Sequence, residues 1–582
     1  VVRHTTGARV NVGPNGGFEN DGLVEITGGG TLVIGRDRSN GSVTGEEFRA
    51  SSGVVSFNGA YDVKSTVANA AITFDTRAPA HTGHLDLNAG SIAVETQFEF
   101  ETLDWTGGGF VSSPGQPILT GQGVIGDPDT KTLSTTLINR GELTWQDGGV
   151  SSAGTTAARL RNDGLFTTDL VESRNFTRLE NRSRGVVRNV GADATISHLN
   201  NLGTLDVVAS TFTLAGTVDN HGGTTLSGGE WIVRDGATID MGAKQITVND
   251  AAVRLFGARA QFDAIDPLAE NRGLFQIAEG RDFTTVGPLI NTGALIVGDG
   301  SSLVVDGTYT QTGANSSLQV NGEFRSTAIG AAAVFQSASR LRGVGTVRTR
   351  VAVRSFGIIA PGFSPGTLTV DALEFGDDAI YEWEYDGVES DSVVVLEDFT
   401  MGATATLQVD QLVGAPDPLA EFTLFSYPES IPDPTNPDWT IVAPSAPGWD
   451  VSAIEIFVDE VGNRVVMTGL SALPNSADFD SDGAVDGKDY AIWQDNFGAS
   501  GIQPGERGDA DRNGATDGAD FLIWQREFGW RLGEPRASGV SRATIVPEPS
   551  ACGIMAIFSL APCLAPWTKR RNQALQRRQA SD

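Results

Sequence analysis

Two short acidic segments near the C-terminal end of the chain have the residue types and spacing of a metal-binding loop. Asp509 follows Asp478 by 31 residues, and both segments place oxygen-bearing side chains at positions 1, 3, 5, 9 and 12, with a glycine at position 6. Calcium is a hard ion that takes about six to eight oxygen ligands, and a loop of about 12 residues wraps it when position 6 turns sharply. The spacing therefore predicts two calcium ions, one in each segment.

The predicted ligands are side-chain oxygens and, at position 7 of each loop, a backbone carbonyl oxygen. They are Asp478, Asp480, Asp482, Ala484, Asp486 and Asp489 in the first loop, and Asp509, Asp511, Asn513, Ala515, Asp517 and Asp520 in the second. Position 9 can act through a water molecule. Carboxylates this close repel one another without a cation, so we expect calcium to be required for folding. An acidic, solvated linker is the alternative, and two matched copies argue against it.

Each loop leads into a segment with helical spacing. In residues 490–498 and 521–529 the aromatic residues fall three and then four positions apart, which places them on one face of a helix. Gly498 and Gly529 stand where a C-terminal cap belongs. A conventional EF-hand has a helix before its loop and a glutamate at position 12, whereas both loops here have aspartate there and no entering helix.

The tandem loop–helix pattern of residues 478–529 resembles a type I dockerin. The resemblance implies that the module binds a cohesin-like domain, which in that family usually attaches polysaccharide-degrading enzymes to a scaffold or cell surface. It also implies that loop positions 10 and 11 select the partner. These positions are Gly487-Lys488 and Gly518-Ala519 here, where well-known cellulosomal examples carry pairs of hydroxyl residues.

The long region before the module repeats at a nearly constant interval. A motif of the form L-x-N-x-G-x-L recurs, with intervals of 23, 19, 20 and 19 residues from Asn139 to Asn220. One unit cannot bury its apolar face alone, but stacked units build a continuous core. Stacked turns would also align the asparagine amides in a hydrogen-bonded ladder, with Asn and Gly in left-handed backbone conformations. We therefore expect residues 1–340 to form a mainly β, right-handed parallel β-helix or solenoid; a series of β-sandwiches is the alternative.

The sequence pattern of residues 341–470 differs from that of the preceding repeats. The run from Gly357 to Val370 resembles the terminal rungs of autotransporter-type passenger repeats, which implies a β-helix closed by a C-terminal cap. Prolines are frequent in residues 427–447, and because proline cannot donate to a strand ladder, this stretch is predicted to be a loop on the cap. Linkers are expected at residues 471–477 and 530–545.

The C-terminal tail resembles a PEP-CTERM sorting signal at residues 546–572, followed by a basic polar tail at 573–582. Pro547-Glu548-Pro549 precedes an apolar run at 551–567, which is near the shortest length for a membrane-spanning helix; a buried amphipathic helix is the alternative. The resemblance implies transient membrane insertion through 551–567 and removal of this hydrophobic sorting helix by an exosortase-type enzyme. The protein would then be exported to the cell surface, the outer membrane or the extracellular matrix.

Composition limits the other classes of function. Lys and Arg number 41 against 72 Asp and Glu, a net charge of −31, and such a surface repels nucleic acid. The two cysteines, Cys552 and Cys563, both lie in the apolar run and cannot build a disulfide framework. The chain begins Val1-Val2 without an initiator methionine or a leader, so we expect it to lack its natural N-terminal portion.

Catalytic residues are not evident. No GxSxG, HExxH or phosphate-binding loop stands out as a catalytic motif, His81 and His84 are expected in a surface loop, and Asp391 is expected in a turn. We therefore predict a non-catalytic, exported structural or adhesive solenoid with calcium-dependent docking to a cohesin-like partner, in the setting of a polysaccharide-degrading assembly. The alternative is a carbohydrate-active enzyme, a polysaccharide lyase or glycoside hydrolase, that uses the β-helix groove.

Overall fold

The computed structural model describes residues 2–530, apart from fifteen short stretches. These are 5–9, 13–17, 36–41, 76–78, 112, 153–157, 329, 331, 363–364, 413–418, 444–448, 473–476, 481–483, 503–506 and 512–513. The predicted linker after residue 530, the sorting signal at 546–572 and the polar tail at 573–582 lie outside the described residues. The chain divides into two compact units, one made of residues 1–446 and 451–471 and the other of residues 447–450 and 472–582.

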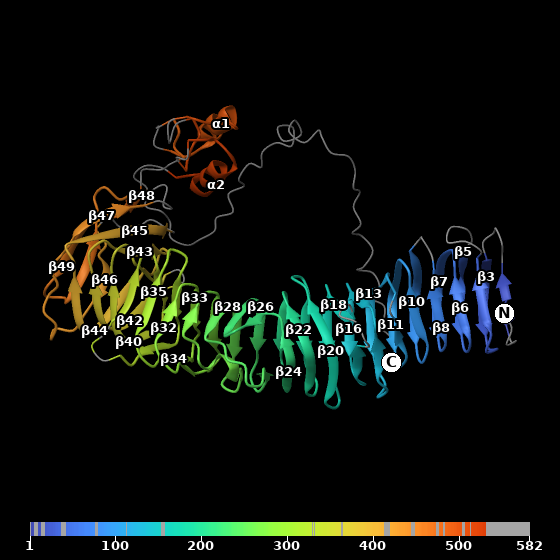
Figure 1. Ribbon diagram of the computed structural model, residues 1–582. Helices are drawn as coiled ribbons and strands as arrows, with labels where there is room; N and C mark the ends of the chain where they lie inside the picture. The colour runs from blue at the N-terminus through green and yellow to red at the C-terminus, as the bar shows by residue number, and fades with distance from the viewer. Residues whose placement is uncertain are drawn as a thin grey trace, which may run out of the picture. The chain divides into compact units, whose positions relative to one another are not determined.

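The first unit is a stack of β-strand rungs (Figure 1). Strand β7 (Ala60–Ala68) pairs in parallel with β5 (Ser42–Ala50) and β9 (Ala80–Leu87), and β22 (Ala194–Asn201) pairs in parallel with β20 (Arg174–Asn181) and β24 (Thr211–Val218). Parallel pairing between neighbouring rungs continues to β45 (Thr404–Leu412) and β47 (Asp438–Val442). The predicted parallel β-solenoid is confirmed, and the β-sandwich alternative is wrong because sandwiches are built from antiparallel sheets. The right-handed winding stays a prediction.

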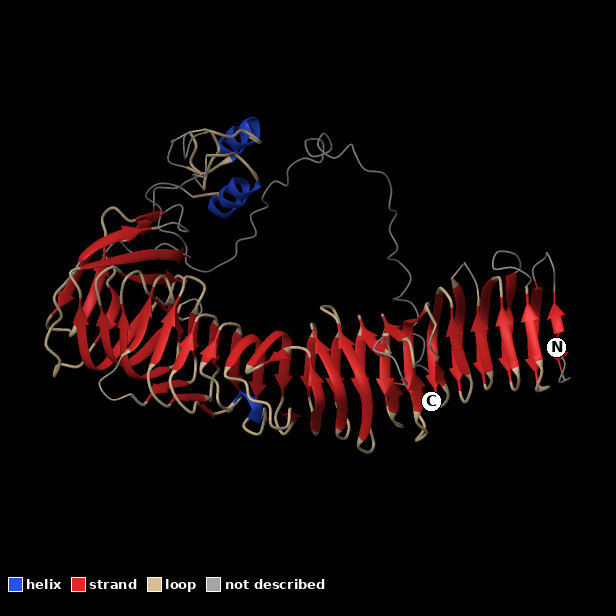
Figure 2. Cartoon of the chain, in the orientation of Figure 1, coloured by secondary structure: helices blue, strands red, loops and turns tan. Residues whose placement is uncertain are grey.

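Alternating residues explain why these segments form strands with one buried face. In β11 (Gln97–Trp105), the side chains of Phe98, Phe100, Leu103 and Trp105 are buried, and polar residues separate them. Since successive rungs are in register, aromatic rings stack along the solenoid: Phe74 lies 5.3 Å from Phe57 and 4.4 Å from Phe98 between ring centroids. The strands dominate the first unit (Figure 2), and the apolar core runs continuously through them.

The predicted asparagine ladder is present. Each Nδ2 of Asn139, Asn162 and Asn181 donates to the Oδ1 of the next member at 2.8 Å, ending at Asn201. A second ladder runs from Asn249 through Asn271 to Asn291 at 2.8 Å and ends on Gln311 at 3.0 Å. All these amides are fully buried. Each Nδ2 also donates to the backbone carbonyl oxygen of a later residue, as Asn181 does to Thr204 at 3.0 Å. The donating amides of the ladder therefore use both of their hydrogens.

The glycine of the repeat has a different role from the one predicted. Gly141, Gly164, Gly203 and Gly293 do not adopt left-handed backbone angles, so that part of the prediction is wrong. A Cβ atom at any of them would clash with a carbonyl oxygen of the preceding rung. The motif therefore needs glycine because two turns approach closely, which leaves no room for a side chain.

The solenoid ends in an antiparallel cap. Strand β50 (Arg464–Thr468) pairs antiparallel with β46 (Phe422–Ser426) on one side and β49 (Glu455–Asp459) on the other. Strand β39 (Arg340–Gly343) spans the predicted boundary between residues 340 and 341, so the rungs of the solenoid continue across this boundary. The loop predicted for 427–447 is wrong at β47, whose five residues contain none of the prolines.

Asp391 lies in the turn between β43 (Ala379–Tyr385) and β44 (Ser392–Met401), as predicted, but its carboxyl group is buried. Its Oδ1 accepts a hydrogen bond from the Gly366 N–H at 2.7 Å, and its Oδ2 accepts one from the Glu384 N–H at 3.0 Å. Burial raises the pKa of Asp391 to about 8, an effect that the charge of Glu384 increases and the backbone hydrogen bonds oppose. The carboxyl group therefore joins the turn to the backbone N–H groups of Gly366 and Glu384, which is a structural role.

Removal of one amide should weaken the ladder. Asn181→Leu is expected to lower the free energy of unfolding by about 2–3 kcal/mol, because Asn162 and Asn201 each lose a buried hydrogen bond. Urea unfolding followed by circular dichroism measures this. The matched control is Asn200→Leu on the neighbouring strand β22, whose half-buried side chain lies on the face opposite to the ladder residue Asn201, and it should change the value by less than about 0.5 kcal/mol. Equal effects would contradict the ladder's role.

Asp391 should make stability depend on pH. Because its pKa is about 8 in the folded chain against 3.8 for an unperturbed aspartate, the folded state holds this proton more tightly. The contribution is fully present below pH 4 and is lost as the pH rises toward about 8. The difference in unfolding free energy between the natural chain and Asp391→Asn should therefore decline from about pH 5 to about pH 8. A flat difference in urea unfolding over this range would show that Asp391 does not titrate there.

Candidate metal centre

The second unit contains the two α-helices of the described residues, α1 (Gly487–Asn496) and α2 (Gly518–Glu527) (Figure 2). Each begins three residues before the segment predicted from its aromatic residues. The reason is the aspartate at position 9, which caps the helix: Asp486 accepts from the Lys488 N–H at 2.8 Å, and Asp517 accepts from the Ala519 N–H at 2.7 Å. Gly498 and Gly529 follow the helices with φ angles of 87° and 89°, as expected of C-terminal caps.

Three predicted ligands of each loop meet. The carboxylate oxygens of Asp478, Asp480 and Asp489 lie within 4.8 Å of one another, and so do those of Asp509, Asp511 and Asp520. In the described part of the chain these are the two groups of three or more His, Cys, Asp or Glu side chains close enough to share a metal ion. Positions 1, 3 and 12 of the two loops therefore converge in the same way.

The other predicted ligands differ in what the structure says of them. Asp482 and Asn513 at position 5 lie outside the described residues. Asp486 and Asp517 at position 9 cap the helices and are not members of the acidic groups. Ala515 at position 7 forms an isolated antiparallel bridge with Ser500. For Ala484, as for Ala515, use of the carbonyl oxygen in metal binding stays a prediction.

The aspartate at position 12 shapes each loop through backbone hydrogen bonds. Asp489 accepts from the Phe479 N–H with Oδ1 and from the Asp486 N–H with Oδ2, both at 2.7 Å. Asp520 accepts in the same manner from Asp511 at 3.0 Å and from Asp517 at 2.7 Å. One carboxylate thus ties the start of each loop to the start of its helix.

The first loop is electrostatically crowded. Burial raises the pKa of Asp489, the backbone hydrogen bonds from Asp486, Phe479 and Asp480 lower it, and the charge of Asp480 raises it further. A divalent cation between these carboxylates would remove the repulsion between them. The oxygen-only donor set and its convergence therefore fit a hard cation.

Each loop is supported by the helix of the other half. The Trp524 indole Nε1–H donates to the Asp486 carbonyl oxygen at 2.9 Å, and the Trp493 Nε1–H donates to the Asp517 carbonyl oxygen at 2.7 Å. These two bonds are equivalent under the duplication, since they join matching positions of the two halves.

Backbone hydrogen bonds cross between the halves in the same pattern. Val485 accepts from the Gly529 N–H at 2.8 Å and donates to the Trp530 carbonyl oxygen at 3.0 Å. Thr516, its counterpart, accepts from the Gly498 N–H at 2.8 Å and donates to the Ala499 carbonyl oxygen at 2.9 Å. Neither loop is complete without the residues that follow the opposite helix.

The module has a small core of its own. Ala477, Val485, Ala510 and Trp524 are buried, and Tyr490, Phe521, Ile523 and Phe528 are among the side chains that pack against them. The rings of Tyr490 and Trp524 lie 5.0 Å apart, and those of Trp493 and Phe521 lie 4.9 Å apart between centroids. The aromatic faces predicted for the two helices therefore meet each other.

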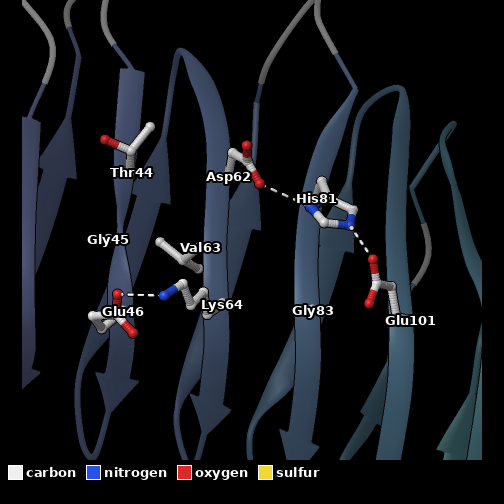
Figure 3. Close-up of a pocket in the computed structure, with 9 residues that line it drawn as sticks. All are labelled: Thr44, Gly45, Glu46, Asp62, Val63, Lys64, His81, Gly83 and Glu101. Atoms are coloured by element: carbon white, nitrogen blue, oxygen red, sulfur yellow. Dashed lines mark hydrogen bonds and ion pairs between the residues drawn. The ribbon is translucent and has the colours of Figure 1, made fainter. Parts of the chain in front are cut away.

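The solenoid carries a second candidate site, a surface depression of about 530 Å³ (Figure 3). It is lined by Thr44, Gly45, Glu46, Asp62, Val63, Lys64, His81, Gly83 and Glu101. In Figure 3, His81 lies between Asp62 and Glu101: its Nδ1 is 2.8 Å from Asp62 Oδ1, and its Nε2 is 3.8 Å from Glu101 Oε1. The prediction that His81 and His84 lie in a surface loop is wrong, because both belong to strand β9.

Most of the charge in this depression is already paired. Lys64 Nζ lies 2.6 Å from Glu46 Oε1, and the imidazole of His81 separates Asp62 from Glu101. Two carboxylates facing each other across a cleft are what glycoside hydrolysis requires. Here an imidazole stands between them, so the arrangement resembles a row of polar contacts between rungs more than an acid and base around a substrate.

The sequence was compared with family models and with curated proteins. No family model matches the chain, and no curated protein matches its sequence. Within the residues that the structure describes, no helix has the length and apolar character needed to span a membrane. The apolar run at 551–567 lies outside them.

Two features of these sites were missed from the sequence. The crossed tryptophan bonds depend on how the halves pack, and spacing along one loop carries no information about that. The row of Asp62, His81 and Glu101 did leave a signal, since the three residues are 19 and 20 positions apart, which is the length of one rung. Polar residues at the repeat interval lie side by side in a solenoid.

Proposed function

We propose that the protein is an exported structural or adhesive solenoid whose C-terminal loop–helix pair binds two calcium ions and then docks to a partner domain. The observation that carries the proposal is the convergence of positions 1, 3 and 12 in both loops, with matching backbone hydrogen bonds to the carboxylate at position 12. A linker of acidic residues would have no reason to repeat this geometry twice.

The donor set favours calcium over other metals. Residues 478–529 contain neither histidine nor cysteine, which are the ligands that zinc prefers in structural sites. Magnesium requires near-ideal octahedral geometry and retains water, whereas calcium accepts many oxygen ligands in flexible loops. Asp478, Asp480 and Asp489 would hold one ion, and Asp509, Asp511 and Asp520 the other, completed by the remaining predicted ligands. Bound calcium would supply the positive charge that lets these carboxylates remain together.

Docking is proposed at the positions that the dockerin resemblance singles out. Gly487 and Lys488 are exposed on the first turn of α1, and Gly518 and Ala519 are exposed on the first turn of α2. A cohesin-like domain is the proposed partner. Calcium would control this docking because positions 10 and 11 lie between position 9, which caps the helix, and position 12, which closes the loop.

Export rests on the C-terminal sequence. The Pro-Glu-Pro motif, the apolar run and the basic residues that follow it support transient insertion of 551–567 and removal by an exosortase-type enzyme. The proposed destination is the cell surface, the outer membrane or the extracellular matrix. A solenoid with a continuous apolar core and hydrogen-bonded asparagine ladders suits a scaffold in such a place.

A second candidate function is cleavage of a polysaccharide in the depression of Figure 3. The observation in its favour is the presence of Glu46, Asp62 and Glu101 around one hollow, because carboxylates supply the acid and the base of glycoside hydrolysis. The pairing of Glu46 with Lys64 and of Asp62 with His81 counts against it.

An activity assay separates the two candidates. Residues 1–470 incubated with pectin, alginate or cellulose should release neither reducing ends nor unsaturated sugars if the solenoid is a scaffold. Release of products that Glu101→Gln abolishes, with Glu142→Gln on a later rung as the control, would establish the enzyme instead.

Calcium should organise the module. Addition of calcium to residues 472–532, up to about 1 mM, is expected to raise helicity and change the fluorescence of Trp493 and Trp524. Calorimetry on the full chain should find two ions. Asp478→Ala combined with Asp509→Ala should abolish both effects, because each substitution removes position 1 of a loop.

The matched control is Asp495→Ala, which removes an exposed carboxylate of α1 outside the acidic groups. It should leave the calcium response unchanged. A fragment that is equally helical in chelator and in calcium would argue against the metal sites.

A further inference from the structure

Position 11 distinguishes the two loops. It is Lys488 in the first and Ala519 in the second, although the neighbouring positions 9, 10 and 12 are identical. Lys488 Nζ lies 3.9 Å from Asp480 Oδ2. Asp480 is one of the three carboxylates that converge in the first loop. A positive charge of the protein itself therefore lies beside an oxygen that the proposed ion needs.

We infer that Lys488 is a built-in competitor of calcium: its ammonium group and the ion compete for Asp480, which weakens calcium binding at the first loop. The inference rests on the proposed function, and it assigns to Lys488 a role in setting affinity rather than in holding the ion. Ala519 has no charge with which to act in this way on Asp511, the counterpart of Asp480.

The geometry makes the competition direct. Asp480 and Lys488 belong to the same loop and helix start, and Asp489, which follows Lys488, accepts hydrogen bonds from the N–H groups of Phe479 and Asp480. The first turn of α1 is thus fastened to the segment that carries Asp480, so the base of the lysine side chain cannot move far away. The ammonium remains near the ion whenever its side chain does not extend into solvent.

Exposure limits the size of the effect. The Lys488 side chain is 65% exposed and that of Asp480 is 27% exposed, so water screens their attraction. A unit charge a few ångströms from a divalent ion at a protein surface still changes affinity by about three- to tenfold. The effect should shrink as salt is added, because exposed charges are screened over about 8–10 Å at physiological ionic strength.

The second loop has a basic residue of its own, Arg512, which lies outside the described residues. It stands at position 4, between predicted ligands, and its counterpart in the first loop is Ser481. The effect of Lys488 on calcium affinity therefore belongs to the first loop alone.

Lys488 also links calcium binding to docking. Lys488 is one of the residues proposed to face the partner, and an ion that takes Asp480 leaves the ammonium without that carboxylate. An acidic group on the partner could then bind it. By linkage, such a group would raise calcium affinity by the same factor by which calcium raises the affinity for the partner.

The test is calcium calorimetry on the full chain at low ionic strength. Lys488→Ala should tighten one of two binding steps by about three- to tenfold, and Lys488→Arg, which keeps the charge, should do so far less. Ala519→Lys, the reciprocal change, should weaken the other step. Arg526→Ala, which removes an exposed charge of α2 away from the acidic groups, serves as the control and should change neither step by more than about twofold.

A double-mutant cycle assigns the effect to the pair. In a chain that carries Asp480→Ala, the additional change Lys488→Ala should alter calcium affinity much less than it does in the natural chain. Calcium binding by the natural chain with no tightening in Lys488→Ala would overturn the inference and leave the proposed function standing. Absence of calcium binding in every variant would overturn the proposed function itself.

Discussion

The register between neighbouring rungs decides what every side chain of this solenoid can contact. Parallel strands in register place equivalent residues of successive repeats side by side, so each residue meets its own counterpart. Such stacking is favourable for side chains that attract copies of themselves, such as apolar groups, aromatic rings and amides. It is also favourable where the sign of the charge alternates from rung to rung. The asparagine ladder meets this condition most fully, because each amide is both a donor and an acceptor.

The same constraint explains the charged surface of the solenoid. Like charges on neighbouring rungs repel, and in many places the sequence alternates their sign from rung to rung. Glu46 and Lys64 are one such pair, Arg354 with Glu374 another, and Asp235 with Arg259 a third. A chain with a net charge of −31 can in this way keep many of its carboxylates next to cations of its own. The ion pairs are individually weak at the surface, and their main effect is to avoid repulsion.

Sequence reasoning succeeded where a residue's partner lies at a fixed interval along the chain. The asparagines of the repeat predicted both the solenoid and the ladder, because a period of about 20 residues and a buried amide admit few other arrangements. Reasoning failed where the reason was local crowding: Gly203 is required by the approach of the previous turn, which no single repeat reveals. The spacing of the aromatic residues predicts a helix that begins at residue 490, three residues after the observed start of α1. The aromatic residues mark the buried face of the helix, whereas Asp486 caps its first turn.

In the module, duplication has a different outcome from repetition in the solenoid. The two halves do not stack in register but face each other, so Trp493 and Trp524 exchange bonds with opposite loops and the carboxylates of each half converge on a centre of their own. Convergence is what the solenoid avoids. Many of its carboxylates are paired with cations of neighbouring rungs, whereas those of the loops gather in two groups whose mutual repulsion a divalent cation would offset. Under the proposed function, calcium removal should therefore act on the loop–helix pair and leave the rungs intact, so that the ion would control docking without being a condition for the scaffold.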